Sequence, residues 1–284
     1  MGEDRMQLQR FELKYVVGED AALAIREFIR SYLELDEFGA SRPNYSYPVH
    51  SLYLDSDDLA LYRGTINGDK NRFKLRLRYY NDDPQTPVFF EIKRRLNNII
   101  AKQRGGVHRK AVAWLLGGHL PEPAHLVSPG AKQLVAVERF CQLMTRQHAK
   151  PKAHIAYQRE AWISPHDNSV RVTLDRHIQC EPRLNHQLTT RVNRPVVVFD
   201  RQVVLELKFT DRFPDWFRDL VRVFSLMQCG AAKYAEGVNL LGEDRFLGGP
   251  GEPAFAGLTG RATPSEFLRG EPDQPASRWT EKII

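Results

Sequence analysis

The chain has 284 residues, of which 42% are hydrophobic and 10% aromatic, which supplies a packed core and excludes a disordered protein. Its 41 basic and 35 acidic residues give a formal net charge of +6, a modest excess that favours an anionic partner. Its three cysteines are too scattered for a disulfide framework or a CxxC metal site, so we expect buried thiols.

The two ends of the chain carry no signal for membrane insertion. The N-terminal stretch MGEDRMQLQRFELKY is charged where a signal peptide needs an apolar segment. No later run approaches the roughly 20 apolar residues of a membrane span, so we expect a cytoplasmic protein. Residues 248–284 are rich in Gly and Pro and show no sustained period. We therefore predict one folded domain over 1–247 followed by a flexible C-terminal tail.

The first third of the chain predicts strands with one helix among them. Residues 11–17 alternate as a strand does, and 19–36 place apolar residues at helical spacing. Residues 49–56 are β-branched and aromatic, which predicts another strand. The stretch RFKLRLRYYNDDPQTPVFFEIKRR (72–95) predicts two strands joined by a loop, and 98–106 predicts a third strand beside them.

The rest of the chain predicts more helices and strands. Helices are expected over 108–116 and 130–147, and a last one from Pro214 to about Gly230. Strands are expected over 154–164, 170–178, 195–200 and 203–209. About eight or nine strands with a few helices predict an α+β protein with a large antiparallel sheet or barrel.

The charges of the predicted strands share one face. Residues two apart on a strand point the same way, so Lys74, Arg76 and Arg78 lie together, opposite an apolar set. The same parity places further charged side chains on that face: Glu91, Lys93, Arg95, Lys102, Arg104, Arg171, Glu206 and Lys208, with Glu12 and Lys14 as an earlier E-x-K pair.

Two interpretations fit such a face. An ordinary solvated sheet face mixes charge signs, because like charges opposite one another destabilise a strand pair. A face that is cationic over several strands instead suggests a barrel with the charges inward, around a hydrated space for phosphates. Arg and Lys both bind phosphate well, and a Glu among them can either hold Mg²⁺ or Mn²⁺ or simply pair with Lys.

A set of motifs in order resembles the VTC domain, the catalytic module of polyphosphate polymerases and a member of the triphosphate tunnel metalloenzyme (CYTH-like) superfamily. The motifs run from about residue 10 to 241: RFELKY, SLYLDS, KLRLRYY, FFEIKRR, AKQR, AYQREAW, VRVTLD, VLELKF and KYAEG. The resemblance implies an antiparallel β-barrel tunnel, a divalent cation (Mn²⁺ or Mg²⁺), and transfer of the γ-phosphate of ATP onto a polyphosphate chain.

The resemblance also implies roles for individual residues. The basic wall that holds ATP and polyphosphate is expected to comprise Lys14, Lys74, Arg76, Arg78, Lys93, Arg95, Lys102, Arg104, Tyr157, Arg159, Arg171, Lys208, Lys233 and Tyr234. Of these, Arg76, Arg78, Lys93, Arg171 and Lys208 are expected to act in catalysis. Glu206 is the expected metal ligand, with Glu12 and Glu91 as further candidates.

The sequence departs from the family pattern at several points. The superfamily signature E-x-E-x-K would need Glu where Arg10 stands, which argues against a simple triphosphatase, and Ala232 replaces a Ser expected before the KY pair. The SPX domain and membrane helices of eukaryotic members have no counterpart here, which suggests a stand-alone bacterial-type enzyme.

Other functions stay open from the sequence. A hydrolase of the same fold would use water as the acceptor, and a non-catalytic module would only bind polyphosphate or another polyanion. Sequence-specific nucleic-acid binding is not expected, because it would require the cations on an outer face.

Overall fold

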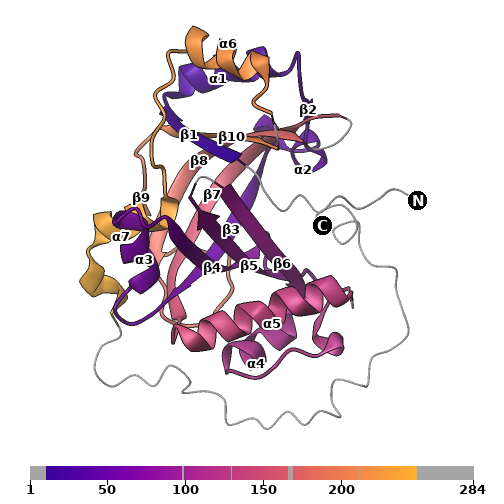
Figure 1. The fold of residues 1–284 in the computed structure, drawn as a ribbon, viewed down its shortest axis with the longest axis vertical. Helices are drawn as coiled ribbons and strands as arrows, with labels where there is room; N and C mark the ends of the chain where they lie inside the picture. Colours follow the sequence, from indigo (N-terminus) through magenta and orange to yellow (C-terminus); the bar gives the residue numbers. More distant parts are fainter. Residues whose placement is uncertain (1–10, 98, 129, 166–168, 211, 248–284) are drawn as a thin grey trace.

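The computed structural model describes residues 11–97, 99–128, 130–165, 169–210 and 212–247. Its centre is an antiparallel sheet whose path runs β1-β10-β8-β7-β3-β4-β5-β6, with β2 paired to β7 and β9 to β8 (Figure 1). The strands are β1 (Phe11–Val17), β2 (Glu34–Leu35), β3 (Ser46–Asp55), β4 (Asn71–Tyr79), β5 (Val88–Leu96), β6 (Ile99–Val107), β7 (Lys150–Ile163), β8 (Val170–Pro182), β9 (Val196–Val197) and β10 (Val203–Phe209).

Helices surround the sheet in three groups. In Figure 1, α1 and α6 lie at the top, α3 and α7 at the left, and α4 and α5 at the bottom. The α-helices are α1 (Glu19–Ile29), α2 (Glu37–Ala40), α3 (Ala60–Ile66), α4 (Val112–Leu116), α5 (Ala131–Arg146), α6 (Asp215–Val223) and α7 (Lys233–Leu241). Short 3₁₀ turns occupy Pro43–Tyr45, Arg109–Ala111, Pro123–His125 and Glu243–Phe246.

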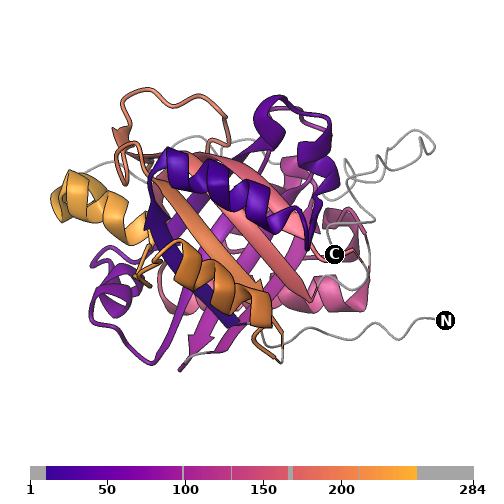
Figure 2. The ribbon, with the colours of Figure 1, turned by 90° about the horizontal axis from the view of Figure 1, so that it is seen from above.

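A separate hydrophobic cluster lies beneath each pair of helices. Helices α1 and α6 pack Ile25 and Phe217 against β1, β8 and β10, and Figure 2 shows both helices lying across the strands. Helices α4 and α5 cover β4 and β5, where Phe140 meets Phe90 edge-on. Helices α3 and α7 pack over β3, β7 and β8. Because these strand faces point outward to the helices, the alternate side chains of the same strands point to the inside of the sheet.

The sheet curls until its two edge strands, β1 and β6, contact one another. Register shifts at Tyr53/Leu54 and Ala156/Gln158 add local bends to β3 and β7. Across the described strands the path begins at β1 and ends at β6, with no ladder between those two. Instead Lys93 of β5 reaches Glu12 of β1, with 2.8 Å between Nζ and Oε2. The predicted α+β antiparallel fold is confirmed, and its edges meet through side chains.

The structure differs from the sequence-based expectations in several places. The helix predicted over 19–36 ends at Ile29, because Glu34–Leu35 pairs with β7. The helix expected to reach Gly230 ends at Val223, because the chain then runs beside β1, where the amide of Cys229 donates to the carbonyl of Lys14. Cys229 is exposed, so the expectation of three buried thiols was wrong for this residue.

Helix α7 was not predicted as an element. The motif KYAEG opens it, and its Lys233 and Tyr234 are both buried. The division into a domain over 1–247 and a tail over 248–284 stays a prediction, because residues 1–10 and the whole of the predicted tail lie outside the described residues.

Candidate functional site

Charged side chains fill the inside of the curled sheet. They come from strands that are far apart in the sequence, together with one residue of α7. We call this set the inner face: Glu12, Lys14, Lys74, Arg76, Arg78, Glu91, Lys93, Lys102, Arg104, Arg159, Arg171, Asp175, Glu206, Lys208 and Lys233. The convergence predicted from strand parity is therefore what the fold produces.

The two halves of the inner face differ in charge. On β4, β5 and β6 three lysines stand side by side, because Lys74 pairs with Lys93 and Lys93 with Lys102 in the strand register. Like charges directly opposite one another destabilise a sheet. Two of the three lysines also lie beside a carboxylate, since Lys93 is 2.8 Å from Glu12 and Lys102 is 2.7 Å from Glu91. Among the described residues, Lys74 is therefore the lysine of this row that no carboxylate neutralises, and an anion over the row would meet its charge.

One carboxylate balances the cations next to that row. Glu91 has a fully buried side chain and accepts a hydrogen bond from Arg76 Nε at 2.8 Å, and Lys102 Nζ forms an ion pair with its other oxygen at 2.7 Å. Arg78 Nε lies 3.8 Å from the Glu91 carboxylate. Burial would raise the pKa of Glu91, but Arg78, Lys102 and Arg76 outweigh burial and hold that pKa well below its usual range.

The second half of the inner face is centred on Glu206 of β10. Its carboxylate lies 2.6 Å from Lys208 Nζ, 3.1 Å from Lys233 Nζ, and 3.2 Å from Lys14 Nζ. Burial opposes ionisation of Glu206, yet these cations hold its pKa well below the usual value. Glu206 is therefore a buried anion held mainly by cations, with the hydroxyl of Thr173 as a further donor at 3.4 Å.

Two more carboxylates share the cations around Glu206. Lys14 also lies 3.3 Å from Glu12, whose pKa is lowered because Lys93 and Lys14 outweigh burial and the repulsion from Glu206. Asp175 accepts two hydrogen bonds of 2.7 Å from the guanidinium of Arg159. The acidic residues of the inner face thus gather mainly on β1, β8 and β10.

Several cationic donors of the basic half have no hydrogen-bond partner among the described residues. Lys74 makes no hydrogen bond or ion pair with any described residue, and burial together with Lys14 and Lys93 lowers its pKa well below the usual value. Nη2 of Arg104 and Nε of Arg78 are buried and make no hydrogen bond within the described part of the chain. Such donors are costly unless a ligand accepts from them.

Solvent reaches part of this face. The side chains of Lys102, Lys93 and Lys14 are 41%, 28% and 22% exposed, whereas that of Glu91 is fully buried. These three lysine side chains are accessible to solvent, whereas the carboxylates of Glu12 and Glu91 that pair with them are buried. A small anion that approaches this face from solvent therefore contacts lysine ammonium groups before it comes near a carboxylate.

A divalent cation fits this donor set in chemical terms. Glu206 and Glu12 supply carboxylate oxygens, which Mg²⁺ and Mn²⁺ prefer, and both carboxylates converge on the ammonium of Lys14. A bound cation would neutralise these two carboxylates in place of the Lys14 ammonium. Within the described residues no group of three or more His, Cys, Asp or Glu side chains is placed to hold a metal. Further ligands would have to come from phosphate oxygens or water.

Four other predicted site residues differ in how they relate to the inner face. Arg171 binds Asp36 at 2.6 Å, and Arg95 donates to the backbone carbonyl of Asn97 at a strand end. The hydroxyl of Tyr157 accepts from Arg78 on the inner face. Tyr234 does not reach the inner face, since it is 2% exposed and its hydroxyl donates to Asp55.

Sequence reasoning missed two residues of the site. Asp175 continues the parity of Arg171 and Thr173 on β8, so the alternation of VRVTLD could have identified it. Tyr53 of β3 accepts from Arg76 at 3.1 Å and stacks on Tyr234 with ring centroids 4.9 Å apart. It carries no charge, so the search for cations passed over it.

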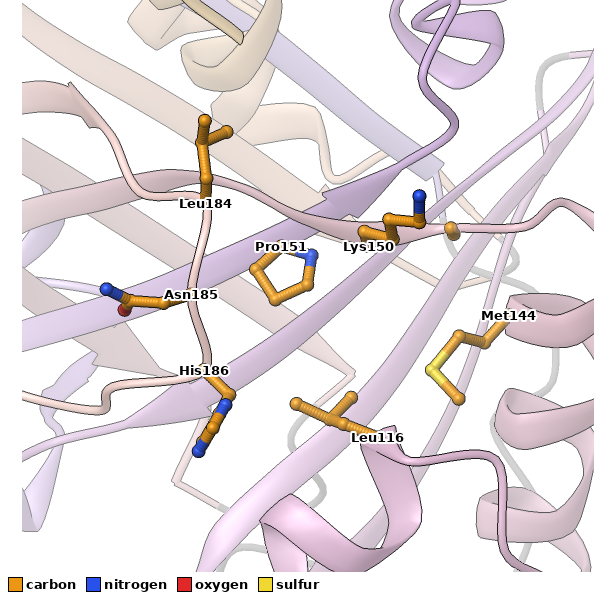
Figure 3. A pocket seen from close by; sticks show the side chains of 8 residues that line it. Leu116, Met144, Lys150, Pro151, Leu184, Asn185 and His186 are labelled. Atoms are coloured by element: carbon orange, nitrogen blue, oxygen red, sulfur yellow. The ribbon is translucent and has the colours of Figure 1, made fainter. Parts of the chain in front are cut away.

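A shallow pocket also lies outside the sheet (Figure 3). It is lined by Leu116, Met144, Pro151, Leu184 and neighbouring residues. None of its lining residues belongs to the inner face. It therefore plays no part in the candidate site.

The comparison with known families identifies the family of this chain. The family model of the VTC domain matches residues 9–242. The chain belongs to the VTC domain family. The match covers the strands that build the inner face, from Glu12 to Lys208, and the start of α7 with Lys233.

Two curated relatives come from Schizosaccharomyces pombe (strain 972). Vacuolar transporter chaperone complex subunit 4 is 23% identical over 284 aligned residues, which cover 86% of this VTC domain chain and 39% of that protein. Subunit 2 of that complex is 28% identical over 131 residues, or 44% of this chain and 18% of that protein. The chain thus spans less than half of the length of either relative.

Two solved structures are similar in outline. A putative adenylate cyclase from Bacillus halodurans has a TM-score of 0.46 at 14% identity, over 78% of this chain and 91% of that one. The Mediator head module of Schizosaccharomyces pombe has a TM-score of 0.41 at 7% identity, over 76% of this chain and 94% of that one. Both TM-scores are below 0.5, so no functional statement rests on them. Among the described residues, no helix has the length and apolar character needed to cross a membrane.

Proposed function

We propose that this VTC domain transfers the γ-phosphate of ATP onto a growing chain of inorganic polyphosphate. The observation that carries the proposal is the row of Lys74, Lys93 and Lys102, in which like charges are adjacent on three strands and Lys74 has no carboxylate partner among the described residues. A linear polyanion matches such a row, because each phosphate unit brings a negative charge to an ammonium group.

Phosphoryl transfer needs positioning and positive charge more than covalent help from the protein. In the proposed step an oxygen of the terminal phosphate of the acceptor forms a bond to the γ-phosphorus of ATP. The bond between that phosphorus and the bridging β,γ-oxygen breaks, and ADP leaves with the electron pair. Arg76, Arg78 and Arg104 offer guanidinium donors to the oxygens that gain charge, and Lys74 adds an unpaired ammonium.

Glu206 and Glu12 are the proposed metal ligands. When bound there, Mn²⁺ or Mg²⁺ would neutralise charge on phosphate oxygens and hold them in place. Glu206 also keeps Lys208, Lys233 and Lys14 oriented through its three ion pairs. The same carboxylate thus organises both the cations of the protein and the proposed metal.

The test is incubation of the purified chain with ATP and Mn²⁺, followed by gel detection of long phosphate chains. Glu206→Gln and Arg76→Ala should abolish polymer formation while the thermal transition of the protein remains cooperative. Glu243→Gln is the matched control, because the Glu243 side chain is 43% exposed and pairs with Arg63 outside the inner face.

Each result has a defined meaning. Unchanged polymer formation in the Glu206→Gln variant would refute the role of this residue. Release of orthophosphate without polymer would identify a hydrolase. Binding of polyphosphate without ATP turnover would identify a non-catalytic module.

A further inference from the structure

At one end the inner face changes from charged to aromatic side chains. Along β4 its positions run Lys74, Arg76, Arg78 and then Tyr80 just beyond the strand, and along β5 the residue beyond Glu91 is Phe89. The basic positions are thus followed by two aromatic rings whose centroids are 6.2 Å apart.

The aromatic side chains continue across neighbouring elements. Tyr47 of β3 lies 6.3 Å from Tyr80, and Phe38 of α2 lies 6.1 Å from Tyr47, both between ring centroids. We call Phe38, Tyr47, Tyr80 and Phe89 the aromatic row. Tyr47 and Phe89 are each 8% exposed, whereas Tyr80 and Phe38 are partly exposed.

Two arginines contact the aromatic row, one at Phe89 and one at Tyr47. The guanidinium carbon of Arg104 lies 3.7 Å from the centroid of the Phe89 ring, and its Nη2 is buried without a hydrogen-bond partner in the described part of the chain. Arg171 Nη2 lies 3.5 Å from the hydroxyl of Tyr47. The rings of the row are edge-on or tilted to one another, and the row places aromatic rings beside cationic donors that are unpaired or partly paired.

This combination matches a ligand with a flat ring at one end and several phosphates at the other. Every nucleobase has a π-face that stacks on aromatic side chains or on a guanidinium plane, independent of which base it is. Inorganic polyphosphate has no such ring and gains nothing from the aromatic row. We propose that the aromatic row binds the base of the nucleoside triphosphate and thereby directs its phosphates toward Arg78 and Arg104.

The inference rests on the proposed function, because it assumes that a nucleotide is the phosphate donor. It identifies the part of the site that distinguishes the nucleotide donor from the polyphosphate acceptor. The aromatic row should contribute to the affinity for ATP and not to the affinity for a phosphate chain. The base should be bound with little selectivity, because stacking does not read its hydrogen-bonding edge.

The experiment compares two ligands on two variants of one residue. Tyr80→Leu removes the partly exposed ring and keeps apolar volume, and Tyr80→Phe keeps the ring. Dissociation constants for ATP and for inorganic tripolyphosphate are measured by calorimetry at one Mn²⁺ concentration. Tyr32→Leu is the matched control, since Tyr32 is 45% exposed and stacks on Trp216 outside the inner face.

Tyr80→Leu should weaken ATP binding by about tenfold and change tripolyphosphate binding by less than about twofold. Tyr80→Phe and Tyr32→Leu should bind both ligands as the unmodified chain does. Equal weakening of both ligands by Tyr80→Leu would show that the ring only supports the fold and would overturn the inference. Unchanged ATP binding would overturn it as well.

Failure of the inference and failure of the proposed function give different results. If ATP binding weakens selectively but no polymer forms, the aromatic row is confirmed and the polymerase proposal fails. If polymer forms and the two ligands respond alike, the polymerase proposal stands and the aromatic row fails. If the unmodified chain binds neither ligand, both are refuted.

Discussion

Replacing Glu91 with Gln removes the negative charge that faces Arg76, Arg78 and Lys102 at the centre of the basic half. The Glu91 side chain is fully buried, and its closest nitrogens lie at 2.7 Å. Removing one partner of a buried ion pair costs about 3–5 kcal/mol, because the remaining charges lose their counter-ion. For a domain of this size, about 2–4 °C per kcal/mol predicts a melting temperature lower by roughly 6–20 °C.

The same substitution should strengthen anion binding. Without Glu91 the basic half is more positive, so inorganic tripolyphosphate should raise the melting temperature of Glu91→Gln by more than that of the unmodified chain. Glu27→Gln serves as the control, because the Glu27 and Arg30 side chains are 64% and 61% exposed and such pairs contribute less than about 1 kcal/mol. Scanning calorimetry with and without tripolyphosphate measures both effects. Equal stability losses in the two variants, or no extra response to the anion, would refute this account of Glu91.

Three further predictions concern other groups of the described chain. Burial lowers the pKa of Lys208 to about 7 although Glu206 opposes the shift. The affinity for tripolyphosphate, measured by calorimetry, should therefore fall as pH rises above 7, and this fall should be smaller in Lys208→Met. Burial lowers the pKa of His50 and His154 to about 4, so the stabilisation that comes from keeping them neutral should be fully present above pH 6.5. The unfolding free energy measured with urea should then fall as pH drops from 6.5 toward 4, and His154→Gln should make this fall smaller. Arg159→Lys replaces the two 2.7 Å hydrogen bonds to Asp175 with one, and we expect a loss of about 1–3 kcal/mol in urea unfolding; no loss would show that this fork is dispensable.

The sequence predicted the strands of this fold well because they alternate strictly. The run KLRLRYY places charges and apolar residues on opposite faces, and both the outer hydrophobic cluster and the inner face follow from that parity. The helix ends were less predictable, since the end of α1 depends on the pairing of Glu34–Leu35 with a strand more than a hundred residues away. Local spacing holds no information about such a partner.

The site shows the same division. Parity was enough to bring Arg76, Lys93 and Lys208 to one face, but the register that places Lys74, Lys93 and Lys102 side by side exists only after the strands pair. Tyr234 belongs to a motif shared with the family, yet its ring faces Tyr53 and its hydroxyl faces Asp55. The motif singles out Tyr234 as a candidate, whereas the direction in which its side chain points depends on how α7 packs.

The contact between β1 and β6 has a physical consequence of its own. Elsewhere the sheet is joined by backbone hydrogen bonds, which added salt hardly weakens. Along this one seam Lys93 of β5 instead pairs with Glu12 of β1 at 2.8 Å, and because the Glu12 side chain is only 5% exposed, salt screens this pair less than a surface pair. Two side chains therefore hold this line of the wall, so a single substitution can alter it, whereas no single side-chain substitution removes a backbone ladder.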